Sequence, residues 1–152
     1  MKEGQKYIAV EGQAKTWEEA IELCGETLLK NGYVEEGFSS ACIEREKEFP
    51  TGLCSEIPVA IPHCKSDAIK KNGVCYLRLK EPVVFHRMDD DEETISTRNI
   101  FNIAIKGTED HLEFLQQMMG VVMNKELLLH IEELNIEKVP ELLENHFLSN
   151  LE

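Results

Sequence analysis

Apolar residues at helical spacing occur in four stretches of the chain. In the first, residues 17–28, apolar positions recur every three or four residues, as on the buried face of a helix. Thr16 stands before this stretch and Glu19 follows three residues later, a pair that predicts a capping box. Gly32 predicts the end of the helix, because glycine adopts a left-handed conformation at little cost. The same spacing predicts helices from Thr108 to about 123, over 127–134 and over 139–147.

Short runs of β-branched and aromatic residues predict strands over 7–10, 57–61 and 100–105. Pro62 directly follows the second run, and a residue before proline favours extended backbone. Residues 74–79 and 82–86 are predicted to form a hairpin with a turn at Lys80-Glu81, and a short helix is expected over 39–47. Because strands alternate with helices, residues 1–152 are predicted to form a single α/β domain.

The charge of the chain limits its partners. The sequence has 152 residues and a formal net charge of -13, from 29 acidic and 16 basic residues. Coating of DNA or RNA needs a basic surface and is excluded, and binding to anionic lipid is disfavoured. A basic protein partner is compatible with this charge. The chain has no run of roughly 20 apolar residues and no apolar segment behind its N-terminus, so we expect neither a membrane span nor a secretory signal.

Two composition features suggest metal or redox chemistry, and neither fits a known pattern. The five cysteines are an odd number without a Cys-x-x-C pair. They therefore predict reduced thiols in a cytoplasmic protein and no zinc or redox motif. The acidic run at positions 89–93 lacks the glycine and the spaced ligands of a calcium loop. It is predicted to be a solvated hairpin loop.

His63 is the foremost candidate for chemistry. It follows a short apolar strand and Pro62, and side chains just past strand ends form the sites of many α/β sheets. A neutral imidazole is a nucleophile near neutral pH when one nitrogen is oriented by a hydrogen bond. The alternative is a surface or core histidine without a role. The adjacent Cys64 is not expected to pair with His63, because neighbouring residues of a strand point apart.

Three other residues could assist His63. His111 would be the third helical residue if Thr108 is the N-cap, and a helix N-terminus favours anions such as phosphate. It could equally replace the glutamate of a capping box. Arg45 offers a fixed fork of donors that suits phosphate, although acids flank it as on a solvated face. The Thr51 hydroxyl could orient an imidazole or a phosphate, or only shape a turn.

The motifs around His63 resemble the active-site signature of enzyme IIA domains of the fructose–mannitol class, EIIA type 2. These domains belong to the bacterial phosphoenolpyruvate-dependent sugar phosphotransferase system. The signature comprises Glu44-Arg45-Glu46, Pro50-Thr51-Gly52-Leu53 and Val59-Ala60-Ile61-Pro62-His63. The strand at 102–105 and the helix with His111 follow in family order, so the resemblance covers about 7–147. The amino-acid sequence at 50–53 and 61–64 is most similar to that of the galactitol-type branch.

The resemblance implies a fold, a reaction and partners. The fold would be a mixed parallel and antiparallel sheet flanked by helices on both faces. His63 would accept a phosphoryl group on its ε2 nitrogen from the phosphocarrier protein HPr and pass it to enzyme IIB, for uptake of a sugar or sugar alcohol. His111 would hold the phosphoryl oxygens, and Arg45 and Thr51 would support the site. The transfer would take place in the cytoplasm without metal, nucleotide or other cofactor, and the membrane enzyme IIC would be a separate chain.

The resemblance leaves some alternatives open. IIA-like domains of the nitrogen-related type use the same histidine to signal to other proteins, and a catalytically silent binding domain would not be phosphorylated at all. Residues 54–58 read Cys-Ser-Glu-Ile-Pro, where many members have a small, glycine-rich segment. We therefore expect the rim of the site to differ here. In a relay, the net charge of -13 would speed brief encounters with partners.

Overall fold

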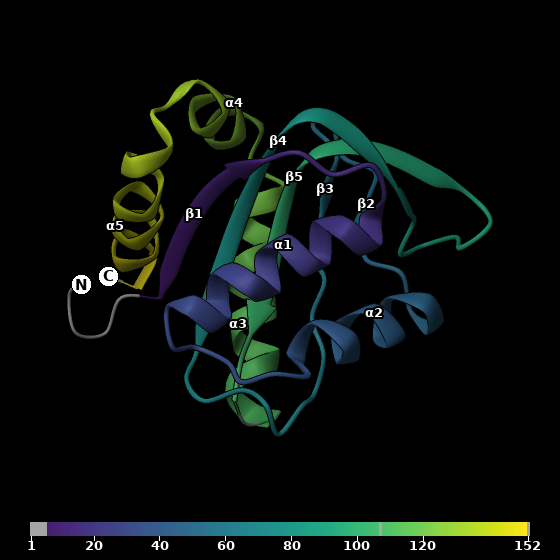
Figure 1. The fold of residues 1–152 in the computed structure, drawn as a ribbon. Helices are drawn as coiled ribbons and strands as arrows, with labels where there is room; N and C mark the ends of the chain where they lie inside the picture. The colour runs from purple at the N-terminus through teal and green to yellow at the C-terminus, as the bar shows by residue number, and fades with distance from the viewer. Residues whose placement is uncertain (1–5, 107, 152) are drawn as a thin grey trace.

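In the part of the chain that the computed structural model describes, five strands form one mixed sheet in the order β1-β4-β5-β3-β2 (Figure 1). The structure describes residues 6–106 and 108–151, without the side chains of 108–111 and 147–151. The strands are β1 (Tyr7–Gly12), β2 (Gly52–Leu53), β3 (Val59–Ala60), β4 (Gly73–His86) and β5 (Thr94–Ala104). β1 runs parallel to β4 and β3 runs parallel to β5, whereas β4 pairs with β5 and β2 with β3 in antiparallel register.

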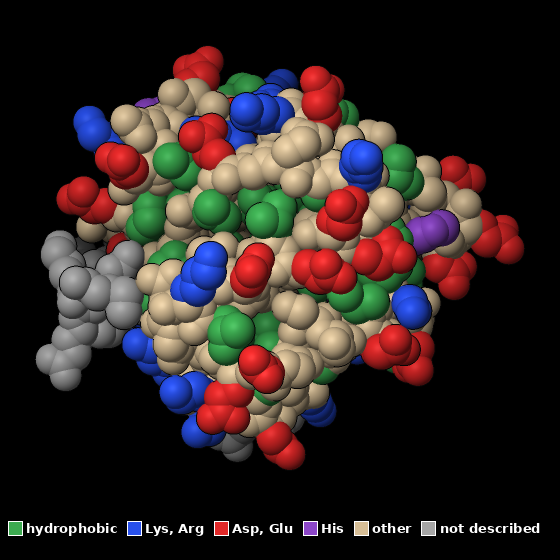
Figure 2. All heavy atoms as spheres, viewed as in Figure 1, with side chains coloured by type: hydrophobic (Ala, Val, Ile, Leu, Met, Phe, Trp, Pro, Cys, Tyr) green, Lys and Arg blue, Asp and Glu red, His purple; other side chains and the backbone are tan. Residues whose placement is uncertain are grey.

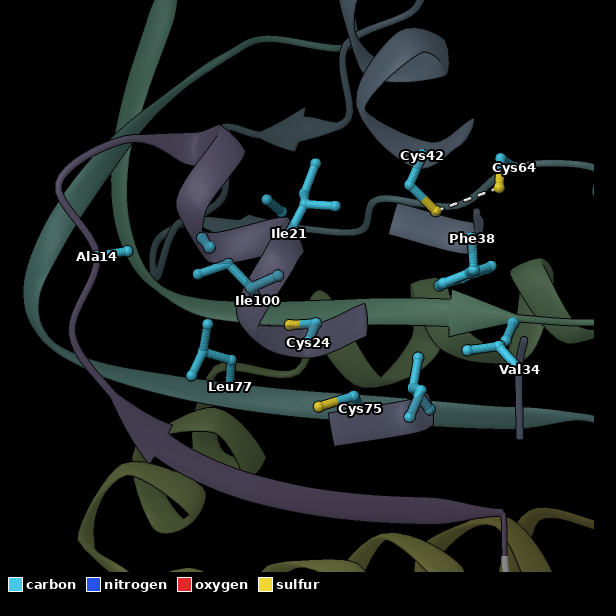
Figure 3. Close-up of a cluster of buried hydrophobic side chains, with 14 of the residues drawn as sticks. Ala14, Ile21, Cys24, Val34, Phe38, Cys42, Cys64, Cys75, Leu77 and Ile100 are labelled. Carbon is cyan, nitrogen blue, oxygen red and sulfur yellow. Dashed lines mark hydrogen bonds between the residues drawn. The ribbon is translucent and has the colours of Figure 1, made fainter. Parts of the chain in front are cut away.

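Helices cover both faces of this sheet, as Figure 1 shows. α1 (Trp17–Lys30) and α2 (Phe38–Glu48) bury one apolar core against it, part of which is drawn in Figure 3. α3 (Thr108–Val122), α4 (Lys125–Glu133), the 3-10 turn η1 (Ile136–Lys138) and α5 (Val139–Leu151) enclose a second core. The predicted α/β fold with a mixed sheet and helices on both faces is therefore confirmed. Within the described ranges, no helix has the length and apolar character needed to cross a membrane.

The start of α1 follows the sequence prediction closely. The Thr16 hydroxyl accepts a hydrogen bond from the Glu19 amide at 3.2 Å, which satisfies one of the unpaired amides at the helix start. The Glu19 carboxylate reaches back to the amide of Lys15 at 3.0 Å, one residue earlier than a standard capping box. Gly32 follows the helix with a φ of 81°, a left-handed conformation that glycine adopts without strain.

The predicted hairpin at 74–86 is wrong. Residues Lys80 and Glu81 lie within the single long strand β4, and the pairing register with β5 shifts between Arg78 and Val83. A bulge of this kind bends a strand without ending it. The residues of this bulge are mostly polar and include a proline, so their sequence resembles that of a turn. The hairpin instead joins β4 to β5, and the acidic run at 89–93 is its exposed loop, as predicted.

Other element boundaries differ by a few residues. The strand predicted at 57–61 is reduced to β3, and β5 begins at Thr94, six residues before the predicted start. The helix expected over 39–47 is α2, one residue longer at each end. α3 already includes Thr108, which we expected as the N-cap one position before the helix.

Candidate functional site

His63 lies beside the central strand β5. Beyond the end of β3, the chain continues along β5 and His63 forms an isolated parallel bridge with Ile103. The carbonyl of Pro62 accepts hydrogen bonds from the Ile103 amide and from the Asn102 side-chain amide, both at 2.9 Å. The residue is buried, with 7% of its surface exposed. The backbone that carries the imidazole is thus held against β5 at Pro62 and at His63.

The histidine ring has a defined tautomer. Its Nδ1 lies 2.7 Å from the carbonyl oxygen of Ile61. Because a carbonyl oxygen can only accept, Nδ1 carries the proton and donates it. In the neutral ring the lone pair is therefore on Nε2, the nitrogen that the sequence resemblance assigns to the phosphoryl group. An imidazole oriented in this way can act as a nucleophile without a change of tautomer.

Thr51 holds the backbone just before His63 through a hydrogen bond. Its backbone carbonyl accepts a hydrogen bond from the Ile61 amide at 3.3 Å. Its own amide and hydroxyl donate to the two carboxylate oxygens of Glu46, at 2.7 and 2.8 Å. A chain of hydrogen bonds therefore leads from Glu46 through Thr51 and Ile61 to the ring of His63.

Glu46 is a buried acid with 4% of its surface exposed. Burial raises its pKa to about 7, although the hydrogen bonds from Thr51 and the charges of Arg45 and His86 oppose this shift. No separate role for Glu46 was predicted from the sequence. A signal was available, because Phe38, Cys42 and Glu46 are spaced four residues apart and are the buried positions of α2. An acid that continues a buried helical stripe needs a partner, which here is Thr51.

A hollow of about 820 Å³ opens at His63, and we call it the large hollow. Arg45 and Thr51 line it together with the histidine, so the fold brings these three predicted residues to one place. The rest of its wall comes from the end of α2 and the residues after it, the residue after β3, the tip of the β4–β5 hairpin and α3: Glu48, Phe49, Pro50, Ile61, Met88, Asp89, Asp90, Asp91, Leu115 and Met119. Residues 54–58, where a different rim was expected, are not among these lining residues.

Arg45 is half-buried and held by its neighbour one turn later. Its guanidinium lies over the Phe49 ring, 4.5 Å from the centroid, and donates to the Phe49 carbonyl at 3.1 Å. These contacts use one face and one nitrogen of a group that has five N–H donors. Arg45 also lines a second cavity of about 250 Å³, the small hollow, with Ala41, His63, Cys64 and Lys65.

The tip of the β4–β5 hairpin contacts Gly52, the residue after Thr51. The Met88 amide donates to the Gly52 carbonyl at 2.8 Å, and Arg87 forms a parallel bridge with Gly52. A Cβ atom on Gly52 would lie only 2.5 Å from the carbonyl oxygen of His86. The threonine–glycine turn therefore needs its glycine for close backbone contact. The acidic run was predicted to be a solvated loop only, but Asp89, Asp90 and Asp91 also border the large hollow.

The remaining predicted residue, His111, falls within α3, and its side chain lies outside the described part of the structure. Leu115, four residues after His111 in the same helix, does line the large hollow. Among the residues that the structure describes, no group of three or more His, Cys, Asp or Glu side chains could hold a metal ion.

Comparison with known proteins gives a family match over almost the whole chain. Residues 4–146 match the family described as the phosphoenolpyruvate-dependent sugar phosphotransferase system, EIIA 2. The mannitol-specific phosphotransferase enzyme IIA component of Enterococcus faecalis is 39% identical over 114 residues, covering 73% of this chain and 74% of that protein. The galactitol-specific EIIA component of Escherichia coli K12 is 28% identical over 110 residues, covering 72% and 73%.

A solved structure has the same architecture. The enzyme IIA mannitol chain in a complex with phosphorylated enzyme IIB mannitol from Escherichia coli superimposes with a TM-score of 0.74. It is 28% identical, and the match covers 95% of this chain and 98% of that chain. Fold and sequence similarity thus extend over the same residues.

Proposed function

Because the chain belongs to the EIIA 2 family of the phosphoenolpyruvate-dependent sugar phosphotransferase system, we propose that His63 is its phosphoryl carrier. Components of this family are phosphotransferases that pass phosphoryl groups between proteins, and the chain is one of them. In the proposed relay His63 accepts the group from HPr and passes it to enzyme IIB in the cytoplasm. The observation that carries the assignment is the bond from His63 Nδ1 to the Ile61 carbonyl, which puts the lone pair on Nε2.

In the proposed step, the Nε2 lone pair attacks the phosphorus atom of the phosphorylated donor. A new N–P bond forms as the bond between phosphorus and the donor nitrogen breaks, and the donor imidazole keeps its electron pair. His63 retains its Nδ1 proton throughout, and the Ile61 carbonyl stabilises the positive charge that the ring gains. Transfer to enzyme IIB is the same displacement with phospho-His63 as the donor. Phosphoryl transfer of this kind depends mainly on in-line positioning and on donors for the equatorial oxygens.

Arg45 and His111 are the proposed oxygen donors. Arg45 lines both hollows next to His63, and its fork of N–H groups matches phosphoryl oxygens. His111 is proposed from its place one helical turn before the pocket residue Leu115, near the N-terminus of α3. Thr51 acts indirectly in this scheme, because it anchors the backbone of Ile61.

The acids around the large hollow favour a protein as the phosphoryl donor. Asp89, Asp90 and Asp91 are exposed at the hairpin tip and border the hollow. Figure 2 shows acidic side chains gathered where Figure 1 places the turn between β4 and β5. Such a rim repels a small free anion, whereas a protein with a basic docking surface is attracted to it. This supports delivery of the phosphoryl group by a carrier protein.

A sugar alcohol is the proposed substrate class of the transport system. The relatives named for mannitol and galactitol both fit this class, and the mannitol-specific relative is the more similar of the two reported. The sequence at 50–53 and 61–64 suggested the galactitol branch, and specificity for galactitol stays a prediction. The solved complex of a related IIA chain with phosphorylated enzyme IIB supports enzyme IIB as the acceptor.

Reconstitution with phosphoenolpyruvate, enzyme I and HPr tests the first half of the relay. We expect an acid-labile, base-stable phosphate on the wild type and none on His63→Ala. His130→Ala is the matched control, because His130 is an exposed histidine on α4 and should be phosphorylated at the wild-type rate. Phosphate on the His63→Ala protein would reject the assignment.

Single-turnover transfer from the phosphorylated chain tests the second half. Transfer to a mannitol-type and to a galactitol-type enzyme IIB should be compared, and we expect the mannitol-type acceptor to discharge the chain faster. His111→Ala should slow the transfer. A phosphorylated chain that discharges to neither acceptor would point instead to the regulatory, nitrogen-type function.

A further inference from the structure

Two cysteines face each other beside the candidate phosphoryl acceptor. Cys42 on α2 and Cys64, the residue after His63, have their sulfur atoms 3.2 Å apart, although they are 22 residues apart in the sequence. Figure 3 shows the two side chains pointing toward one another at the edge of the core. Both are free thiols. No Cys-x-x-C spacing pointed to this pair, and only the fold brings the two thiols together.

We propose that Cys42 and Cys64 are a peroxide-sensitive dithiol whose disulfide form restrains the His63 site. Cys64 is the residue that reacts first, because it lines the small hollow. That hollow measures about 250 Å³, several times the roughly 30 Å³ that a water molecule occupies, so hydrogen peroxide fits in it. Arg45 and Lys65 line the same hollow and supply positive charge.

The pKa values of the two thiols are shifted in opposite directions, as expected when one thiol attacks and the other resolves. The hydrogen bond with Cys42 and the charge of Arg45 lower the pKa of Cys64 despite its burial. The same hydrogen bond and burial raise the pKa of Cys42. Thiolates are the reactive form, and low-pKa cysteines occur next to cationic side chains. Cys64 is therefore the attacking thiolate and Cys42 the resolving thiol.

Hydrogen peroxide is the only co-reactant that oxidation of the two thiols requires. The Cys64 thiolate attacks one oxygen of hydrogen peroxide, the O–O bond breaks, hydroxide leaves and Cys64 becomes a sulfenic acid. The Cys42 sulfur then attacks the Cys64 sulfur, forming the S–S bond, and the sulfenic oxygen leaves as water with the thiol proton. Two electrons pass from the two thiols to peroxide, and a dithiol reductant reverses the change.

The disulfide would act on His63 through the backbone. A disulfide bond is about 2.05 Å long, so the sulfur atoms must approach by about 1 Å from their separation of 3.2 Å. Cys64 is bonded directly to His63, and Cys42 lies three residues before Arg45 on the same helix. A displacement of about 1 Å at a reacting group can cost on the order of 100-fold in rate. This consequence depends on the proposed role of His63 as phosphoryl acceptor.

The test uses the full chain with Cys54→Ser, because Cys54 is exposed and would otherwise form disulfides between molecules. After treatment with hydrogen peroxide, we expect an intact mass lower by two hydrogens. Alkylation of the unfolded chain should then add two fewer groups than on the reduced chain, and proteolysis should link the peptides of Cys42 and Cys64. Phosphorylation by HPr should fall at least about tenfold and recover with dithiothreitol. Cys64→Ser should form no disulfide and keep its phosphorylation rate after peroxide treatment.

Peptide mapping of the chain with Cys42 and Cys64 intact makes the result independent of whether Cys64→Ser folds. Linkage through Cys24 or Cys75, or oxidation of Cys64 to a sulfinic acid without a disulfide, would overturn the dithiol. A disulfide between Cys42 and Cys64 that leaves the phosphorylation rate unchanged would overturn its control of the site. If the reduced chain is not phosphorylated at all, the proposed function fails, whereas peptide mapping still decides on the dithiol.

Discussion

Thr51 binds both carboxylate oxygens of Glu46, with its amide at 2.7 Å and with its hydroxyl at 2.8 Å. Both residues are almost fully buried, with 1% and 4% of their surface exposed. A buried carboxylate is costly unless donors satisfy it, and here one residue supplies two of them. The end of α2 is thereby joined to the backbone that holds the His63 segment.

Thr51→Val should weaken this connection. The variant keeps the size of the side chain but removes the hydroxyl donor from a buried acid, at a cost of about 1–3 kcal/mol in the free energy of unfolding. Denaturant unfolding measures the loss, and phosphorylation of His63 should slow as well. Thr51→Ser keeps the hydroxyl and should restore most of both. Equal behaviour of the valine and serine variants would show that the hydroxyl does not matter.

Glu46→Gln should remove a specific part of the pH dependence of stability. The pKa of Glu46 is about 7 in the folded chain against 4.5 for an ordinary glutamate, so the folded state binds this proton more tightly. Between about pH 4.5 and 7 the unfolded chain ionises first, and the free energy of unfolding falls as pH rises, by about 3 kcal/mol from this group. Above pH 7 the effect is constant.

The measurement is the difference in unfolding free energy between Glu46→Gln and the wild type across this range. Glutamine can accept from the Thr51 amide and donate to its hydroxyl, so the site stays hydrogen-bonded. We expect the variant to gain stability relative to the wild type as pH rises from about 4.5 to 7. A difference that does not change with pH would show that Glu46 titrates normally.

Arg45→Ala should slow phosphoryl transfer to His63. Loss of one donor to a charged transition state typically costs about 100- to 1000-fold, and a shared role with other donors would reduce this. Lys47→Ala is the control, because Lys47 lies on the same helix and forms an exposed ion pair with Glu44 at 3.3 Å. If both variants slow the reaction equally, the effect of Arg45 comes from helix α2 in general and not from contact with the phosphoryl group.

Neutralising the hairpin tip should slow the encounter with the phosphoryl donor. In the double variant Asp90→Asn and Asp91→Asn, kcat/KM for phosphorylation by HPr should fall several-fold at low salt and approach the wild-type value at high salt, because salt screens steering. Glu22→Gln with Glu26→Gln, on exposed positions of α1, changes the net charge by the same amount. An equal effect of the two pairs would mean that total charge matters and the hairpin tip does not.

Two glycine substitutions should have opposite effects on stability. Gly52→Ala places a Cβ atom 2.5 Å from the His86 carbonyl oxygen and must displace the hairpin, which costs about 1–3 kcal/mol and slows phosphorylation. Gly120→Ala, in α3, meets no atom within 4 Å and should stabilise the chain by about 0.5–1 kcal/mol. Thermal unfolding of both variants measures this. A stable, fully active Gly52→Ala protein would rule out a need for close backbone contact there.

Local patterns in the sequence predicted the helices, the acidic loop and the position of His63 after a strand. They failed where tertiary contacts decide. Lys80 and Glu81 look like a turn but lie in a bulge that pairing with β5 sustains. The partner of Glu46 could not be named from spacing, and the contact of Cys42 with Cys64 depends on how α2 packs beside the sheet. Helical and strand periods describe one element at a time, whereas these contacts join different elements.

The strand order has a consequence for how the protein is made. β3 is synthesised before β4 and β5, yet it pairs with β5, and the Pro62 carbonyl receives its donor from Asn102, 40 residues later. A nascent chain that ends before β5 therefore lacks the hydrogen bonds that Asn102 and Ile103 donate to the Pro62 carbonyl. Pairing between distant segments forms late, because the intervening loop must close first. Phosphorylation of His63 would thus be restricted to chains in which the central strand is already in place.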